Sequence, residues 1–373
     1  MYFIEERTKK TIFKNFDIKL FLPVLVLAIF GMFILKSATL VRVNSGPRMV
    51  FVQGMCLVVG AIASVIISCF DYREINILVK IAYVLSCILL LVVLVLGLGD
   101  QYGSRSWIKI AGFSLQPAEF AKITFVLVVS QCLAKLKEKN VVLLKDLIPL
   151  LVYTLIPIIL VVLQRDLGTT CVFLAIFFVL LFVYGLDLKY IAGIAGLGIA
   201  LIPIAWFFFL NEKRKDRIRV FLNPELDPLG SGLNVLRSKM TIGSGRLFGK
   251  GLFNGIQTQN SAVPVNESDF IFSVIGEETG FIVSALVVIA FLYIILRCIY
   301  IAQKSEDTYG KFLSMGFVAM IGVHFVENVG MTIGLLPVTG IPLPFISQGG
   351  SSMLANFTAI GFLLSVYRNR KLT

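Results

Sequence analysis

The chain has 373 residues, of which 57% are hydrophobic and only 15% are charged. Ordinary soluble domains carry about 25% charged residues, and a mean hydropathy of +0.90 leaves too much apolar surface for one water-soluble core. The composition therefore excludes a soluble enzyme. The formal net charge of +12 is typical of proteins that bind nucleic acid or an anionic membrane surface, and the hydrophobic content favours the membrane.

Apolar runs long enough to cross a bilayer recur along the whole chain. A helical span needs about 20 mostly apolar residues. Such runs predict ten spans, over residues 18–35, 49–70, 77–98, 117–134, 147–163, 170–186, 190–210, 270–298, 312–334 and 351–367. No small-residue cleavage site follows the first run, which is therefore interpreted as a span and not as a signal peptide. The predicted fold class is an all-α polytopic membrane protein, with residues 1–373 forming one membrane domain.

The basic residues are distributed unevenly between the two sides of these spans. With the N-terminus placed inside, the inner segments hold 18 of the 34 Lys and Arg residues and the short outer loops hold 6. This bias predicts that both termini are cytoplasmic. The long segment 211–269 then falls outside with nine more basic residues, and loops of this length translocate largely regardless of charge. Because the polar and Gly/Pro-rich segments also fall outside, we expect an active site to face outward.

Ionisable residues inside spans are costly and are candidate functional residues. Glu119 and Lys122 have i, i+3 spacing on one helix face, so they form either a self-contained ion pair or the wall of a charged cavity. Asp166 lies at a tight bend, where it caps the next helix, pairs with the neighbouring Arg165 or contributes to a polar site. His324 is the only histidine in the sequence and is interpreted as a hydrogen-bonded packing residue more readily than as a proton relay.

Asp269 ends the long outer segment and opens the eighth predicted span. It is either a helix N-cap or a functional carboxylate beside basic residues. Glu277 and Glu278 follow on the same helix, and we expect one or both to pair with basic groups inside the bundle. The glycines of residues 243–251 allow a ligand to approach the backbone closely, although Gly251 stands where a P-loop needs Ser or Thr.

The basic residues of the outer segment suit a phosphate-bearing lipid. The run Lys213–Arg219 alone indicates contact with anionic headgroups, and arginine and lysine are the usual phosphate partners. Trp107, in another outer loop, either anchors at the membrane interface or stacks on a sugar ring. The six cysteines form no CxxC or Cys/His cluster, so neither a disulfide framework nor a zinc site is indicated.

A series of ordered motifs resembles the SEDS family of cell-wall proteins, which includes rod-shape, division and sporulation members. The motifs are Gly103–Ile108, Gln116–Lys122, Gln164–Gly168, Asp216–Arg219, Phe221–Pro228, Ile242–Gly245, Gly249–Gly251, Ser268–Phe272, Asn328–Met331 and Gly334–Ser347. The resemblance spans essentially the whole chain. The Asn-Pro-Glu sequence at 223–225 resembles the rod-shape members, because division members usually carry Trp after Asn-Pro.

The resemblance implies a peptidoglycan glycosyltransferase that polymerises lipid II, an undecaprenyl-pyrophosphate-linked disaccharide pentapeptide, on the outer face of the cytoplasmic membrane. It implies that Asp269 is the essential aspartate. The other candidate substrate or cavity residues are Glu119, Lys122, Asp166, Arg105, Trp107, Lys250 and Ser347. It also implies a class B penicillin-binding protein as transpeptidase partner, other elongation-machinery membrane proteins, no nucleic acid, and assistance by a divalent cation such as Mg²⁺ or Mn²⁺.

Polymerisation of an α-linked donor into a β-1,4 chain inverts the anomeric carbon. Inversion needs one base and a stabilised leaving group, so we expect Asp269 to be the general base. Lys122 and the outer basic residues are the candidates for stabilising the pyrophosphate.

The sequence is also compatible with other functions. Departures from the family pattern at Leu233, Asn234, Arg237, Arg246 and Gln348 leave the acceptor-site and loop contacts undefined. A lipid II flippase or solute carrier would use buried ionisable residues as a path, and a scaffold would need only its partner interface. A division or sporulation paralogue is the alternative within the family.

Overall fold

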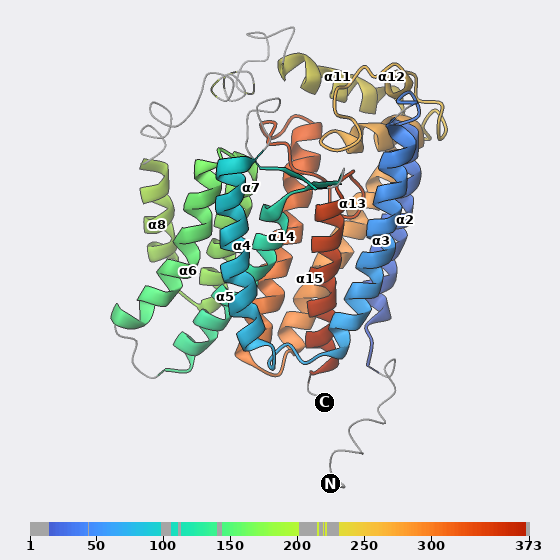
Figure 1. The fold of residues 1–373 in the computed structure, drawn as a ribbon. Coiled ribbons are helices and arrows are strands. Elements are labelled where there is room, and N and C mark those ends of the chain that lie inside the picture. Colours follow the sequence, from blue (N-terminus) through green and yellow to red (C-terminus); the bar gives the residue numbers. More distant parts are fainter. Residues whose placement is uncertain are drawn as a thin grey trace.

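The chain forms, in a computed structural model, a bundle of long helices with a small helical layer over one end (Figure 1). The structure describes residues 15–43, 45–97, 106–110, 113–139, 144–200, 215, 219, 221 and 231–370. The helices are α2 (Ile18–Ala38), α3 (Gly46–Cys69), α4 (Asn76–Leu96), α5 (Pro117–Lys137), α6 (Leu144–Leu163), α7 (Leu167–Tyr184), α8 (Leu188–Ala200), α11 (Ser231–Ser244), α12 (Ile256–Gln259), α13 (Ile271–Lys304), α14 (Thr308–Thr332) and α15 (Gly350–Arg368). Strands β1 (Ile108–Ile110) and β2 (Phe113–Leu115) form an antiparallel hairpin.

Within the described residues, nine helices are long and apolar enough to cross a membrane: α2 to α7, α13, α14 and α15. They confirm nine of the ten predicted spans, with ends that differ by a few residues. The tenth predicted span, 190–210, coincides with α8 as far as Ala200, and its remainder lies outside the described residues. The molecule is a multi-pass membrane protein of the predicted all-α class.

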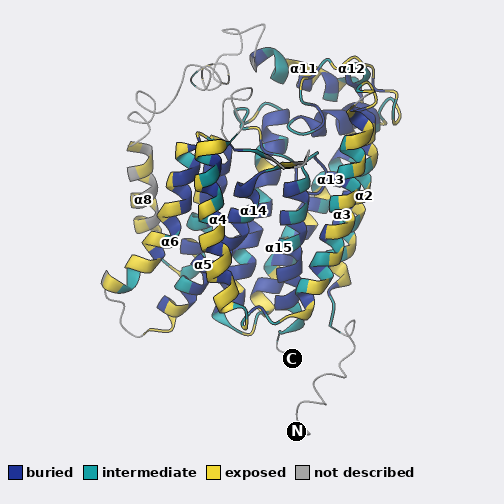
Figure 2. Cartoon of the chain, viewed as in Figure 1, coloured by how far each residue is buried: buried dark blue, intermediate teal, exposed yellow. Residues whose placement is uncertain are grey.

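Burial increases from the outer helices to the centre of the bundle (Figure 2). The most apolar stretch of α5 is 89% buried, whereas that of α3 is 22% buried. The outer helices expose large apolar side chains such as Val58 and Ile62 on α3 and Leu85 on α4, as expected of surfaces that face lipid. The central helices α5, α14 and α15 therefore form the protein interior, where polar side chains can be buried away from lipid.

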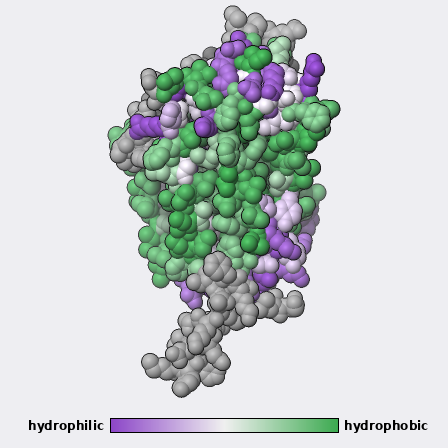
Figure 3. All heavy atoms as spheres, turned by 90° about the vertical axis from the view of Figure 1, so that its right-hand side faces the viewer, coloured by the Kyte–Doolittle hydropathy of each residue, from purple (hydrophilic) through white to green (hydrophobic). Residues whose placement is uncertain are grey.

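The two ends of the bundle differ in character. Helix α2 begins and α15 ends at the same end (Figure 1), and the last turns of α5, α13 and α15 there carry Lys135, Lys137, Lys304 and Arg368. The positive-inside rule assigns this end to the cytoplasm. Helices α11 and α12 cover the opposite end. Figure 3 shows a broad apolar side, with hydrophilic side chains gathered toward the two ends.

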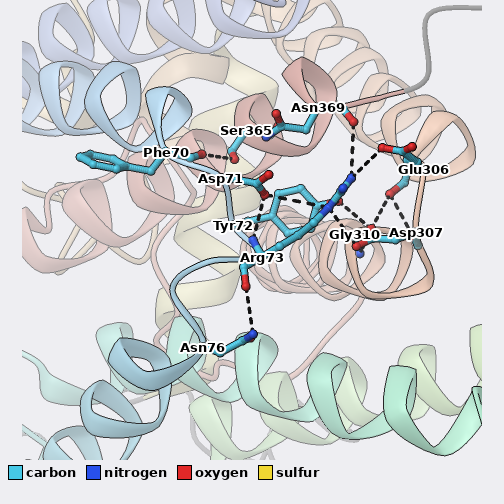
Figure 4. Close-up of polar contacts among 11 residues, drawn as sticks. Phe70, Asp71, Tyr72, Arg73, Asn76, Glu306, Asp307, Gly310, Ser365 and Asn369 are labelled. Carbon is cyan, nitrogen blue, oxygen red and sulfur yellow. Dashed lines mark hydrogen bonds and ion pairs between the residues drawn. The ribbon is translucent and has the colours of Figure 1, made fainter. Parts of the chain in front are cut away.

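A polar network joins the helix connections at the cytoplasmic end (Figure 4). Arg73, between α3 and α4, pairs with Glu306 and with Asp307, at 3.1 Å each, in the α13–α14 connection. The Tyr72 hydroxyl donates a hydrogen bond to Asp307 Oδ1 at 2.6 Å. Burial and this carboxylate raise the pKa of Tyr72 above its usual value. Asp307 also caps α14 by accepting from the Gly310 amide, so this network fixes two connections at once.

Candidate active site

Asp269 lies in the connection between α12 and α13, at the bundle end that α11 and α12 cover (Figure 1). It is half-buried, and Ser268 Oγ donates to its Oδ1 at 2.9 Å. The predicted alternative that Asp269 caps the helix is wrong. The N-cap of α13 is Phe270, which makes no side-chain cap hydrogen bond. The carboxylate of Asp269 is therefore not used as a helix cap.

The backbone around Asp269 is bonded to two other parts of the chain. Three successive carbonyl groups, those of residues 267 to 269, each accept one hydrogen bond. The donors are Gln348 N to Glu267 O at 2.9 Å, Ser347 Oγ to Ser268 O at 2.6 Å and Asn328 Nδ2 to Asp269 O at 3.0 Å. In addition, Arg42, in the α2–α3 connection, pairs with both carboxylate oxygens of Glu267, at 2.7 and 2.8 Å.

Glu119 and Lys122 form a buried ion pair on α5, with 2.9 Å between Lys122 Nζ and Glu119 Oε1. Lys122 Nζ also lies 2.6 Å from His324 Nε2 on α14, and His324 Nδ1 lies 2.6 Å from the Met320 carbonyl. Because a carbonyl only accepts, Nδ1 carries the hydrogen, and Nε2 accepts from the ammonium. The structure thus places this pair as a self-contained network and His324 as a hydrogen-bonded packing residue.

Asp166 is the N-cap of α7 and accepts from the Thr169 amide at 3.1 Å. Its other oxygen, Oδ2, accepts from Ser106 Oγ at 3.0 Å and from Gln116 Nε2 at 3.4 Å. The predicted capping role is confirmed, and the same carboxylate also ties α7 to α5 and to the segment before β1. Trp107 follows Ser106 in that segment. Arg105, the other residue predicted there, lies outside the described residues.

A polar region inside the bundle joins α5, α7 and α14. Glu327 on α14 accepts from Thr339 Oγ1 at 3.3 Å, and α14 packs against both α5 and α7. The three charged residues that the resemblance places in one cavity, Glu119, Lys122 and Asp166, thus come from helices that meet here. Lys122 is only 1% exposed and Glu119 only 3%, so neither is available at a surface in this structure.

Glu277 and Glu278, on the first turns of α13, fasten the segment between α11 and α12. Lys250 Nζ pairs with Glu277 at 2.7 Å, as the sequence predicts for one of these glutamates. Glu277 also accepts from the Gln257 and Thr258 amides, and Glu278 accepts from Ser37 Oγ and the Phe253 amide. Lys250 is therefore placed as an anchor of this segment, which differs from its predicted role as a substrate contact.

The glycines of residues 243–251 approach the backbone of α13. A Cβ on Gly245 would collide with the Gly276 carbonyl, and one on Gly249 would collide with the Glu278 carbonyl. Gly249 and Gly280 also have positive φ values, +78° and +76°, a conformation that glycine adopts readily. The prediction that these glycines make room for a ligand is wrong at positions 245 and 249, because protein backbone occupies that space.

The positions that depart from the family pattern lie near this region. Leu233, Asn234 and Arg237 are on α11, where Arg237 Nη1 donates to the Ala262 carbonyl at 3.1 Å. Arg246 is exposed, with a positive φ of +50°. Gln348 bonds to Glu267 through its main-chain amide.

Sequence reasoning gave no individual role to three polar residues that organise the site, although two of them open recognised motifs. Asn328 lies on α14, Gln116 precedes α5, and Arg42 lies between α2 and α3. The sequence does contain a signal for Asn328, because a side-chain amide in an apolar span is costly unless it is hydrogen-bonded. No local signal pairs Arg42 with Glu267, which is 225 residues away.

The described side chains do not fit a protein-only metal site. Across the described part of the chain, no three His, Cys, Asp or Glu side chains lie close enough together to hold a metal ion.

Comparison with known proteins agrees with this fold. A family model described as a cell cycle protein family, FtsW/RodA/SpoVE, matches residues 18–372. The probable peptidoglycan glycosyltransferase FtsW of Trichlorobacter lovleyi is 33% identical over 364 residues, 96% of this chain and 94% of that protein. Stage V sporulation protein E of Bacillus subtilis is 35% identical over 367 residues, 97% and 98% of the two chains. The peptidoglycan glycosyltransferase MrdB of Escherichia coli K12 is 34% identical over 292 residues, 77% of each chain.

Solved structures show the same architecture. The Thermus thermophilus rod shape determining protein RodA is 25% identical to this chain, and its structure superposes with a TM-score of 0.71. The match covers 97% of this chain and 99% of that one. A chain from a study of polymerization and crosslinking by a peptidoglycan synthase complex is 28% identical, with a TM-score of 0.81 over 97% and 100% of the chains. Fold, motifs and coverage together show that the chain belongs to the FtsW/RodA/SpoVE family, also called SEDS, of multi-pass membrane proteins.

Proposed function

We propose that the chain is a peptidoglycan glycosyltransferase that polymerises lipid II at the outer end of its helix bundle. The observation that carries the proposal is the half-buried Asp269 carboxylate, oriented by Ser268 at the end opposite the basic, cytoplasmic end. Two of the relatives, FtsW and MrdB, bear the name of this activity. A carboxylate at this position is suited to accept a proton from a sugar hydroxyl.

In the proposed reaction, the acceptor sugar hydroxyl attacks the anomeric carbon of the lipid-linked donor. The new glycosidic C–O bond forms as the bond from the anomeric carbon to the pyrophosphate oxygen breaks. Asp269 takes the hydroxyl proton, and the lipid pyrophosphate leaves with the bonding electron pair. The configuration at the anomeric carbon inverts, so no covalent sugar–enzyme intermediate is needed. General-base catalysis of this kind contributes about 10²- to 10⁴-fold in rate.

The leaving pyrophosphate needs positive charge beside it. Lys122 is a poor candidate in this structure, because its ammonium is buried and bonded to Glu119 and His324. Lys250 is also engaged, by Glu277. We assign this role to exposed basic residues of the outer segment, such as Arg246, whose carbonyl accepts from the Phe281 amide of α13. Their guanidinium and ammonium groups are natural phosphate partners.

The test is polymerisation of lipid II by the purified protein with its transpeptidase partner. Asp269→Asn keeps the size of the side chain and removes the base, and we expect glycan strands to disappear. Asp307→Asn is the matched control, because Asp307 is a hydrogen-bonded aspartate at the cytoplasmic end. Normal polymerisation by Asp269→Asn would refute the assignment. In proteoliposomes, movement of labelled lipid II without polymerisation would identify a flippase instead.

We further propose that a class B penicillin-binding protein is the partner and that the chain serves cell elongation. The similar chain from a synthase complex that couples polymerization to crosslinking supports such a partner. The Asn-Pro-Glu sequence at 223–225 supports the elongation role, although FtsW, MrdB and a sporulation protein are all relatives. Depletion of the protein in its own cells should give round cells, whereas filaments would indicate a division role.

A further inference from the structure

We infer that Asn328 and Ser347 are positioning residues for Asp269, which hold the backbone of residues 268 and 269 and thereby set the direction of its carboxylate. The inference rests on the proposed role of Asp269 as general base. It changes the predicted role of Ser347 from substrate contact to support, and it gives Asn328 a function in the reaction. Neither residue needs to touch the substrate.

Asn328 joins the Asp269 segment to the loop before α15. Its side chain is 0% exposed, and its Nδ2 donates to the Asp269 carbonyl at 3.0 Å and to the Ile341 carbonyl at 2.8 Å. Because both partners are carbonyl oxygens, only the amide nitrogen can face them, so the orientation of the side chain is fixed. Both amide hydrogens are therefore committed to two backbone segments that are distant in sequence.

The carbonyl oxygen of Asn328 shows what this arrangement costs. Asn328 Oδ1 is buried and has no hydrogen-bond partner within the described residues. A buried unpaired acceptor is destabilising, and this cost is set against the two hydrogen bonds that Nδ2 donates to the Asp269 and Ile341 carbonyls. One N–H group of the amide bonds the segment that carries Asp269, and the other bonds Ile341 in the loop before α15.

The Ser347 hydroxyl both donates and accepts a hydrogen bond within the protein. Its Oγ donates to the Ser268 carbonyl at 2.6 Å and accepts from the Leu343 amide at 2.9 Å, and the residue is 4% exposed. A serine hydroxyl has one hydrogen to donate, which is committed to Ser268. A substrate contact would have to break this bond, so the geometry favours support of the Asp269 segment.

The hold on residues 268 and 269 matters because a carboxylate moves with its own backbone. The Asp269 side chain is short, so its direction follows the backbone of residues 268 to 270. Misplacement of a reacting group by about 1 Å can lower a rate by about 10²-fold. Gly340 lies beside the carboxylate, since a Cβ there would come within 3.4 Å of Asp269 Oδ2. Rotation of the segment would therefore bring the carboxylate against the 339–341 backbone.

The chain offers a matched control for each residue. Asn356, on α15, is 1% exposed, donates through Nδ2 to the Ser352 carbonyl at 2.8 Å and also has an Oδ1 without a hydrogen-bond partner among the described residues. Ser365 is 0% exposed and donates to the Phe70 carbonyl at 2.7 Å at the cytoplasmic end. Each residue loses a side-chain bond to a backbone carbonyl on substitution, but the bond of Asn356 lies within one helix, whereas those of Asn328 join distant segments. Only Asn328 and Ser347 support Asp269.

The experiment compares Asn328→Leu with Asn356→Leu, and Ser347→Ala with Ser365→Ala, in the purified complex. For each variant, kcat and KM for lipid II and the thermal midpoint are measured. We expect Asn328→Leu and Ser347→Ala to lower kcat by about 10- to 100-fold with little change in KM. The controls should stay within about twofold in kcat, and the thermal midpoint of each variant shows how much of any effect is a loss of stability. Ser347→Thr, which keeps the hydroxyl, should recover part of kcat.

The outcomes separate this inference from the proposed function. If Asp269→Asn is fully active, the proposed function fails. If Asp269→Asn is inactive while both support variants match their controls in kcat, the positioning role is wrong and the proposed function stands. If Asn328→Leu does not fold, Ser347→Ala decides alone, because it removes a single oxygen atom. A rise in KM at constant kcat for Ser347→Ala would indicate a substrate contact and would also overturn the inference.

Discussion

Replacing Lys122 with methionine tests whether the buried charges on α5 and α14 act as one unit. The substitution keeps an unbranched chain but removes the ammonium that lies 2.9 Å from Glu119 Oε1 and 2.6 Å from His324 Nε2. Glu119, 3% exposed, would then be left as a buried carboxylate without its ion partner. Removal of one member of a buried pair typically costs about 3–5 kcal/mol.

The geometry sets the scale of the coupling between the two charges. At 2.9 Å and an effective dielectric constant of 20, the attraction is about 6 kcal/mol, and desolvation of both groups offsets much of it. A coupling of about 2–3 kcal/mol is therefore expected between Glu119 and Lys122. The double variant Glu119→Gln/Lys122→Met should be more stable than Lys122→Met alone, because it leaves no buried charge.

The assay is a double-mutant cycle on the unfolding free energy of the purified protein in detergent. His324→Leu completes the set, with a smaller expected loss of about 1–3 kcal/mol because it leaves one ammonium hydrogen unpaired. Lys189→Met is the control, since its ion pair with Asp187 is exposed on both sides and exposed pairs contribute about 0–1 kcal/mol. If the losses of Glu119→Gln and Lys122→Met simply add, the two residues are not coupled, and the interpretation as a self-contained network is refuted.

Other regions give further predictions. Gly280→Ala should destabilise the fold by at least about 1 kcal/mol, because its φ is +76° and its Cβ would meet the Gly249 amide; a normal thermal midpoint would contradict this. Lys250→Met removes the ion partner of the buried Glu277, so limited proteolysis should cut between α11 and α12 sooner than in the parent protein. Asp166→Ala removes the α7 cap and should cost about 0.5–2 kcal/mol in unfolding free energy. The raised pKa of Tyr72 means that the folded state holds its proton above pH of about 10, where the unfolded state loses it; stability should fall as pH rises there, and Tyr72→Phe should remove that part of the slope.

Spans were predictable because their signal is local. A run of about 20 apolar residues specifies a membrane helix wherever it packs, and α2, α3 and α4 follow this rule within a few residues. The cap at Asp166 was also predictable, because N-capping depends on residues three positions apart. The side of the membrane follows from basic residues near helix ends, as in α5 and α13.

Contacts between distant segments were not predictable from patterns of this kind. The sequence near Lys250 does not predict that its ammonium pairs with Glu277 and not with Glu278. The partner depends on how the segment between α11 and α12 folds against α13. The glycines of 243–251 illustrate the same limit. Their conformational freedom was foreseen, but the group that uses the space is the α13 backbone. Likewise, Phe270 and not Asp269 is the N-cap residue of α13, because bonds from α14 and the 341–348 loop hold the backbone of the Asp269 segment.

The hydrogen bond from position 348 to Glu267 has an evolutionary consequence. It is made by the main-chain amide, so any amino acid except proline supplies it equally well. Glutamine at this position is thus a neutral replacement as far as this bond is concerned. Positions 328 and 347 contribute side-chain atoms and have no comparable freedom. Sequence drift in this loop should therefore be permissive at one position and strict at its neighbour, a contrast that a saturation library selected for growth would display directly.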